Sequence, residues 1–289
     1  MIRVGTRGSA LALAQARCVA ERLEARSELV PITTTGDRRG PVEDKSRWVS
    51  ELERALLHGE IDLAVHSAKD VPAELASGLC IAAIPARADP RDAICGAASL
   101  DTLAPGARVG TSSLRRAAQI RAARDDLELV EIRGNVDTRL RKLDAGEADA
   151  LVLARAGLER LGRLDAVDGT LDELIPAAGQ GALLVEARSG DSLLLDGLDD
   201  PASTACVLVE RQLVRRLGAS CNTPVGALAS PVSGELLELR AWVGLPDGSQ
   251  WVADRIRGAS EGLGNAVAER MLAVGAGELL RRAEQEPAR

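Results

Sequence analysis

Short apolar runs, separated by turn residues and by helical patterns, organise the first part of the chain. The runs predict buried strands at residues 2–6, 29–34, 61–65 and 79–84. Helical patterns at residues 10–23 and 48–58 lie between them, and Ser9 has the chemistry of an N-cap for the first helix. Strands that alternate with helices are typical of α/β domains.

The same pattern recurs further along. Val4-Gly5-Thr6, Ser9 and Ala14-Gln15 recur as Val109-Gly110-Thr111, Ser113 and Ala118-Gln119, and residues 59–65 recur as residues 146–152. The order of these matches is the same in both halves. The repeat predicts two similar α/β lobes with a ligand-binding cleft between them.

Two segments interrupt the repeated pattern. Residues 85–92 contain two prolines, and residues 175–182 are rich in glycine, so both are predicted to be crossings between lobes. A strand at 183–187, a helix at 201–217, strands at 236–243 and 251–256, and a helix at 262–274 follow. We expect domain 1 to contain residues 1–86 and 178–199, domain 2 residues 91–175, and an α+β domain 3 residues 201–289.

Polar residues follow the buried run at 61–65. His66 comes first, then Lys69-Asp70, and Pro72 ends regular structure. In α/β proteins the carboxyl end of a strand is where reactive groups are placed. By itself Lys69-Asp70 is also typical of an exposed ion pair, and His66 is expected to have a structural role because no triad or metal-ligand set accompanies it.

Arginines are concentrated in the second half of the repeat. Arg115 and Arg116 begin a helix, Arg133 follows an expected strand at 127–132, and Arg139 and Arg141 lie in the next helix. Pairing with surface carboxylates explains Arg121, Arg124 and Arg141 well. It explains Arg115 and Arg133 poorly, because a cation at a helix N-terminus opposes the macrodipole unless an anion is present. We therefore expect these side chains to converge on an anionic ligand.

Composition narrows the function further. The formal net charge of −7 argues against a general affinity for nucleic acid, and no apolar run has the length of a membrane span. The five cysteines are widely spaced and form no CxxC pair, which is typical of a reducing cytoplasm. Cys221 differs from the others because it lies among small and turn-forming residues, where a thiol is accessible to modification.

These features together indicate a polyanionic ligand, a carboxylate in its midst and a covalent attachment point. The sequence has no Walker loop, no GxGxxG fingerprint and no cluster of metal ligands. It therefore does not point to nucleotide or metal chemistry.

Six segments resemble those of the porphobilinogen deaminases, also called hydroxymethylbilane synthases, and they occur in the family's order. They are residues 6–15, 64–72, 110–116, 133–144, 176–182 and 221–226. The resemblance implies two lobes built like periplasmic binding proteins, joined by a double-crossing hinge, and a small C-terminal α+β domain. It also implies a monomeric transferase of porphyrin and haem biosynthesis that joins four porphobilinogen molecules head to tail into hydroxymethylbilane and releases four ammonia.

The resemblance also implies roles for single residues. A dipyrromethane cofactor would be attached to Cys221 through a thioether. Asp70 would be the catalytic carboxylate that stabilises the azafulvenium left when ammonia departs. The cofactor would further be bound by Lys69, Ser113, Arg115, Arg116, Arg133, Arg139 and Gln180, and the substrate by Arg7, Ser9, Arg133 and Arg139.

The sequence departs from the family at the loop before the second helix. Lys45 and Trp48 match the family's lid, but Ser50 replaces a lysine and the glycines are missing. This motivates one alternative, a deaminase of reduced activity. A second alternative is a non-catalytic two-lobed protein that binds anions, although ligand capture alone would not need Cys221.

Overall fold

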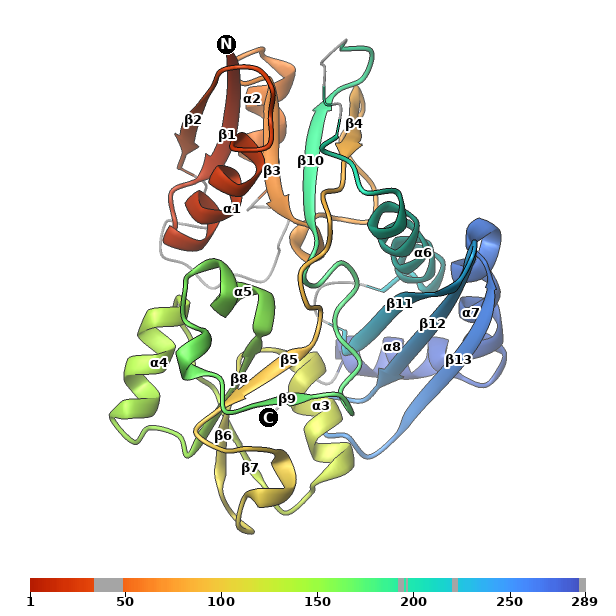
Figure 1. The fold of residues 1–289 in the computed structure, drawn as a ribbon. Helices are drawn as coiled ribbons and strands as arrows, with labels where there is room; N and C mark the ends of the chain where they lie inside the picture. Colours follow the sequence, from red (N-terminus) through yellow and green to blue (C-terminus); the bar gives the residue numbers. More distant parts are fainter. Residues whose placement is uncertain (34–48, 192–194, 196, 220–222, 286–289) are drawn as a thin grey trace. The chain divides into compact units, whose positions relative to one another are not determined.

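The structure is a computed structural model that describes residues 1–33, 49–191, 195, 197–219 and 223–285. Its internal contacts divide the chain into two compact units. The first contains Met1–Ala88 and Gly179–Leu208, and the second contains Asp89–Ala178 and Val209–Arg289. The described residues form three separate sheets, two with five strands and one with three (Figure 1).

The first unit is an α/β lobe built on the five-stranded sheet β2-β1-β3-β10-β4. Strands β1, β2 and β3 are parallel, and β10 is antiparallel to both β3 and β4. Buried aliphatic side chains such as Val4, Val19, Leu63 and Val185 form its core. The elements are β1 (Ile2–Arg7), α1 (Ala10–Ala20), β2 (Ser27–Ile32), α2 (Ser50–Leu57), β3 (Leu63–Ser67), β4 (Leu79–Ala83) and β10 (Leu183–Arg188).

The second unit contains a sheet with the corresponding strand order, β7-β6-β8-β5-β9, although its antiparallel strand β5 comes first in the chain and not last. Strands β6, β7 and β8 are parallel, and β5 is antiparallel to both β8 and β9. The elements are β5 (Asp92–Cys95), β6 (Arg108–Gly110), α3 (Leu114–Ala123), β7 (Glu128–Val130), α4 (Val136–Asp144), β8 (Ala150–Ala154), α5 (Arg155–Arg160) and β9 (Gly169–Leu171).

The two sheets share a side-chain interaction as well as their strand order. Arg3 at the start of β1 donates through its guanidinium and its backbone N–H to Asp62, which precedes β3. Arg108 at the start of β6 does the same with Asp149, which precedes β8. We call each of these arginine–aspartate pairs a clamp. The matching strand order and the matching clamps confirm that the repeated sequence forms two similar α/β lobes.

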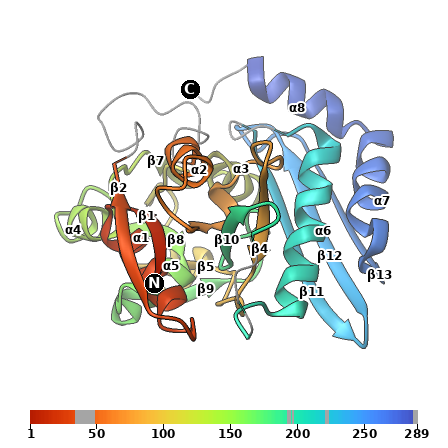
Figure 2. The same ribbon diagram turned by 90° about the horizontal axis from the view of Figure 1, so that it is seen from above.

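The remaining part of the second unit is a three-stranded antiparallel sheet with helices. Strands β11 (Val225–Ser233), β12 (Leu236–Gly244) and β13 (Trp251–Ala259) form the sheet. Helices α7 (Ser260–Ala273) and α8 (Ala276–Gln285) lie along one of its faces (Figure 2). Helix α6 (Pro201–Leu217) leads into this part of the chain, where Glu210 accepts the N–H of Ala229 on β11 at 2.8 Å.

Several sequence expectations need correction. The strand expected at residues 127–132 is only β7 (Glu128–Val130), and β5 begins inside the segment expected to be a crossing. Strands β9 and β11 and helix α8 were not expected. Helix α7 begins at Ser260, and Gly262 interrupts it with a positive φ of 73°. The predicted division into three domains stays a prediction.

Candidate active site

Lys69 and Asp70 lie in a tight turn at the carboxyl end of β3. The turn is a 3₁₀ helix, Ala68–Asp70, and the N–H of Val71 closes it on the carbonyl of Ala68. Both side chains are partly buried. Asp70 therefore lies on a short, fixed turn at a strand end, as the sequence predicted.

The segment before β10 packs directly on this turn. Lys69 Nζ donates to Gln180 Oε1 at 3.4 Å, and the side chain of Gln180 is buried. Gly179 has a φ of 74°, and a Cβ at this position would lie 2.9 Å from Ala68 and from the N of Lys69. Only glycine allows this close approach without strain, so the Gly-Gln-Gly sequence supports the turn that carries Asp70.

Arg7 and Ser9 lie at the same edge of the first sheet. Arg7 is the last residue of β1, which is parallel to β3, so both strands end at this edge. Ser9 is the N-cap of α1, and its Oγ accepts the N–H of Ala12 at 3.3 Å. The first unit thus brings Arg7, Ser9, Lys69, Asp70 and Gln180 to one side of its sheet.

In the second unit, Arg115 and Arg116 are buried in the first turn of α3. Ser113 is the N-cap of this helix. Both guanidinium groups contact one carboxylate, Asp92 on β5: Arg115 Nη1 lies 2.8 Å from Oδ2 and Arg116 Nη2 lies 2.8 Å from Oδ1. Despite its burial, the arginine charges hold the pKa of Asp92 well below its ordinary value.

Arg139 on α4 is half-buried and has a different environment. Its Nε donates to the carbonyl of Gly134 at 2.7 Å, and it forms no ion pair with any described residue. Burial lowers the pKa of its guanidinium, and the positive charge of Arg116 lowers that pKa further. Arg139 and Arg116 are thus close enough to interact, and an anionic ligand would relieve their repulsion.

Arg133 differs from this cluster, and one expectation about it is wrong. Its side chain is 68% exposed, and its Nε donates to Glu131 at 2.7 Å. Arg133 therefore forms a surface ion pair, the arrangement that we did not expect for it from the sequence. Arg124 pairs with Asp126 as expected. Cys221, Lys45 and Trp48 lie outside the described residues.

Sequence reasoning missed two buried acids. Asp92 was assigned to the crossing, and Glu186 was treated as part of an apolar strand, yet neither side chain is exposed. Glu186 Oε2 lies 3.1 Å from His66 Nε2, which gives His66 the structural role expected of it. In the sequence, each is a single acid next to or within an apolar run. An acid in such a position is expected to have a partner, because burying an unpaired charge is costly.

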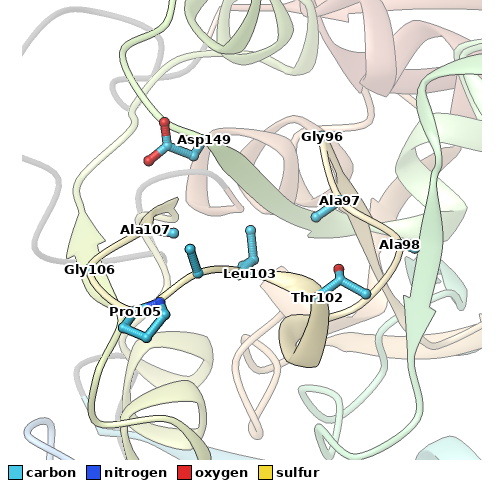
Figure 3. Close-up of a pocket in the computed structure, with 10 residues that line it drawn as sticks. Gly96, Ala97, Ala98, Thr102, Leu103, Pro105, Gly106, Ala107 and Asp149 are labelled. Carbon is cyan, nitrogen blue, oxygen red and sulfur yellow. The ribbon is translucent and has the colours of Figure 1, made fainter.

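A depression of about 680 Å³ lies elsewhere on the second unit (Figure 3). Small residues between Gly96 and Ala107 line most of it, together with Asp149, whose carboxylate is already engaged by Arg108. It lies where β6 and β8 begin, whereas Ser113, Arg115 and Arg116 follow the end of β6. Its lining offers no unengaged charged group, so we do not assign it to the site.

The described residues contain no group of three or more His, Cys, Asp or Glu that could hold a metal ion. Nor does any helix in the described part of the chain have the length and apolar character needed to cross a membrane. The strand-end residues of the two lobes offer carboxylate, guanidinium, ammonium and amide groups. The fold and these groups define a class, an α/β protein with a duplicated lobe and strand-end residues suited to a polycarboxylate ligand.

Comparison with known families identifies the chain more closely. The family model described as "Porphobilinogen deaminase, dipyromethane cofactor binding domain" matches residues 2–196, and "Porphobilinogen deaminase, C-terminal domain" matches residues 204–273. The chain belongs to the porphobilinogen deaminase family, whose members are transferases of tetrapyrrole biosynthesis. This confirms the resemblance and the expected dipyrromethane cofactor.

Individual relatives agree along the whole chain. It is 47% identical to the porphobilinogen deaminase of Roseiflexus castenholzii, covering 96% of this chain and 98% of that one. It is also 47% identical to the Thermus thermophilus protein, covering 97% and 98%, and to the Mycobacterium avium protein, covering 100% and 99%.

Solved structures show weaker likeness. A periplasmic VFT2 domain of Bordetella pertussis BvgS is 15% identical, covers 73% of this chain and 85% of its own, and has a TM-score of 0.40. The methionine binding protein MetQ is 16% identical, covers 73% and 89%, and has the same TM-score.

Proposed function

We propose that the chain is a hydroxymethylbilane synthase, EC 2.5.1.61, which condenses four porphobilinogen molecules head to tail and releases four ammonia. The observation that carries this proposal is Arg139, a half-buried guanidinium that has no carboxylate partner among the described residues and feels the positive charge of the buried Arg116. A cation in this position is stabilised by a ligand that brings its own negative charge. Each pyrrole ring of the substrate carries an acetate and a propionate.

The residues present fit a dipyrromethane cofactor for the same reason. Two such rings carry four carboxylates, which match guanidinium forks in charge and geometry. We assign their binding to Lys69, Ser113, Arg115, Arg116, Arg133, Arg139 and Gln180, and the covalent attachment to Cys221. When bound, this group supplies the nucleophilic pyrrole carbon on which the chain is extended.

Substrate carboxylates would be held by Arg7, Ser9, Arg133 and Arg139. Arg133 is exposed, and its ion pair within the described residues is with Glu131, so it can exchange this partner for a ligand carboxylate at little cost. Arg139 would bind more strongly, because its partial burial reduces competition from water.

Asp70 is the residue we assign to the chemistry. As ammonia leaves the aminomethyl group of porphobilinogen, positive charge develops on the pyrrole, and a carboxylate fixed beside it stabilises that charge. The same carboxylate is suited to accept hydrogen bonds from pyrrole N–H groups. The 3₁₀ turn and the packing of Gly179 hold the Asp70 backbone in place, so little reorganisation is needed during the reaction.

We further propose a monomeric cytoplasmic enzyme that binds neither nucleic acid nor membranes. The negative net charge and the burial of the Cys95 and Cys206 thiols support this. Size-exclusion chromatography with light scattering tests the monomer directly, with a mass near 30.3 kDa expected.

The test of the function combines product and protein mass. Incubation with porphobilinogen should yield hydroxymethylbilane and four ammonia per product. The intact denatured protein should exceed its sequence mass by two pyrrole units. Cys221→Ser should lose both, whereas Cys80→Ser should keep both, because Cys80 lies in β4 and was not assigned to the site. A wild-type protein with neither the added mass nor the product would refute the proposal.

A further inference from the structure

The starting observation is the position of Asp92 in the second unit. It is the first residue of β5, where its backbone is paired with Ala154 of β8 on one side and Leu171 of β9 on the other. Its side chain is fully buried. A carboxylate on a strand bonded along both edges has little freedom to move.

Both arginines at the start of α3 are fixed by this carboxylate and by backbone carbonyls. Arg115 Nη1 contacts Asp92 Oδ2 and donates to the carbonyl of Ile175, both at 2.8 Å. Arg116 Nε donates to Asp92 Oδ1 at 2.9 Å, and its Nη1 donates to the carbonyl of Val152 at 3.1 Å. The two forks are therefore held in defined orientations before any ligand binds.

Stability alone gives a poor account of this arrangement. Burying three charged groups costs desolvation free energy that their attraction only partly returns. Arg115 Nε is also buried without a hydrogen-bond partner among the described residues, which adds to the cost. An expensive buried network next to a ligand site is better explained by what it does for the ligand.

Charge provides a second reason. Arg116 already depresses the pKa of the Arg139 guanidinium through like-charge repulsion. The negative charge of Asp92 offsets part of the field of Arg115 and Arg116, so it favours a fully charged Arg139. Asp92 thus acts on the charge balance around Arg139 through the two arginines that it holds.

We propose that Asp92 is a positioning residue for carboxylate binding: it orients Arg115 and Arg116 for the carboxylates of the cofactor and of the growing pyrrole chain. This rests on the proposed function. The benefit is entropic, because an arginine held in its binding orientation loses less freedom when the ligand arrives.

The test compares Asp92→Asn and Asp92→Glu with the wild type. Asp92→Asn keeps the size of the side chain but removes its charge, and Asp92→Glu keeps the charge but moves it by one methylene. For both variants we expect the KM for porphobilinogen to rise at least about tenfold, a larger change than in kcat. We also expect a smaller fraction of protein with the two-pyrrole mass increment.

Asp89→Asn is the matched control. Asp89 likewise contacts two arginines, Arg91 at 2.7 Å and Arg155 at 3.4 Å, but we assign neither to the site. It should lower the urea midpoint while leaving KM and the mass increment unchanged. A folded Asp92→Asn with wild-type KM and full mass increment would overturn the proposal.

Two further outcomes are decisive. If Asp92→Asn does not fold, wild-type KM and full mass increment in Asp92→Glu would overturn the proposal in the same way. If the wild type itself lacks the mass increment and product, the proposed function fails first, and the two failures are thereby distinguished.

Discussion

The two lobes share a backbone plan but bury different charges. At the same position relative to β1 and β6, each lobe keeps an arginine–aspartate clamp, Arg3 with Asp62 and Arg108 with Asp149. Elsewhere they differ: the first lobe buries His66 with Glu186, and the second buries Asp92 between Arg115 and Arg116.

The strand registers show how far this divergence goes. His66 of β3 corresponds to Leu153 of β8, and Glu186 of β10 corresponds to Cys95 of β5. Where the first lobe has an acid–base pair, the second lobe thus has a leucine and a cysteine. In this duplicated fold the arginine–aspartate clamp that joins neighbouring strands is retained, while the buried charged groups differ between the lobes.

The largest effect on activity is expected at Asp70, which belongs to the first lobe. Asp70→Asn should reduce kcat by about 10²-fold or more, as expected on loss of a charge-stabilising group in the active site. Steady-state kinetics with porphobilinogen measures this. The exposed Glu74→Gln is the control and should be unaffected. Normal turnover by Asp70→Asn would remove Asp70 from the chemistry.

The buried acid–base pair offers a direct exchange between lobes. His66→Leu leaves Glu186 buried without its partner and should cost about 3–5 kcal/mol of unfolding free energy. The double variant His66→Leu/Glu186→Cys imports the pair of residues from the second lobe and should recover most of this loss. Urea unfolding measures both.

The second histidine provides the control for this exchange. His58 is exposed and only 3.8 Å from an equally exposed Glu60, so His58→Leu should change the free energy of unfolding by less than about 0.5 kcal/mol. If the double variant is no more stable than the single one, the two lobes are not interchangeable at this position.

The next variant tests Arg139 of the second lobe, which forms no ion pair with any described residue. Arg139→Gln should raise the KM for porphobilinogen about tenfold or more, the value of a lost charge-assisted hydrogen bond. Its stability should not fall, because burial and the charge of Arg116 already disfavour this guanidinium. Arg141→Gln, exposed on the same helix, is the control. A large loss of stability with unchanged KM would make Arg139 structural.

The smallest effect is expected from the shared clamps. Hydrogen bonds from Arg3 hold the pKa of Asp62 below its ordinary value of 3.8, and Arg108 does the same for Asp149. Because the folded-state pKa values are lowered, both clamps stabilise the protein above about pH 3.8. That contribution disappears as the pH falls through the lower folded-state values.

Acid unfolding compares the two clamps. Asp62→Asn should cost at most about 1 kcal/mol near neutral pH and flatten the loss of stability as the pH falls below about 3.8. Asp149→Asn should do less, because Asp62 also lies 3.6 Å from Arg188 and is less exposed. Equal or reversed effects would contradict the ranking.

Much of the scaffold followed from local sequence. The apolar runs located β1, β3, β4 and β10, and helix α6 was expected with the bounds that it has. Ser9 and Ser113 cap their helices because a serine hydroxyl accepts backbone N–H groups wherever a helix begins. The short strands β5 and β9 were missed, because three or four residues carry too little periodicity to distinguish a strand from a loop.

The site was predicted less evenly, and Arg133 and Arg115 show why. Arg115 lies in the first turn of α3 and Arg133 lies shortly before α4, yet Arg133 is exposed beside Glu131 while Arg115 is buried against Asp92. The sequence separation explains the difference in predictability. Glu131 is two residues from Arg133, whereas Asp92 lies on a strand more than twenty residues before Arg115.

The sequence by itself determined the duplicated α/β plan, the turn that carries Asp70 and the concentration of arginines in the second lobe. These depend on neighbouring residues and on periodicity, which a linear pattern records. Only the tertiary structure decided that Asp92 serves two arginines, that Glu186 pairs with His66 and that Arg139 has no carboxylate partner within the described part of the chain. Partners of buried charges are chosen by strand order and register, which bring together residues far apart in the chain.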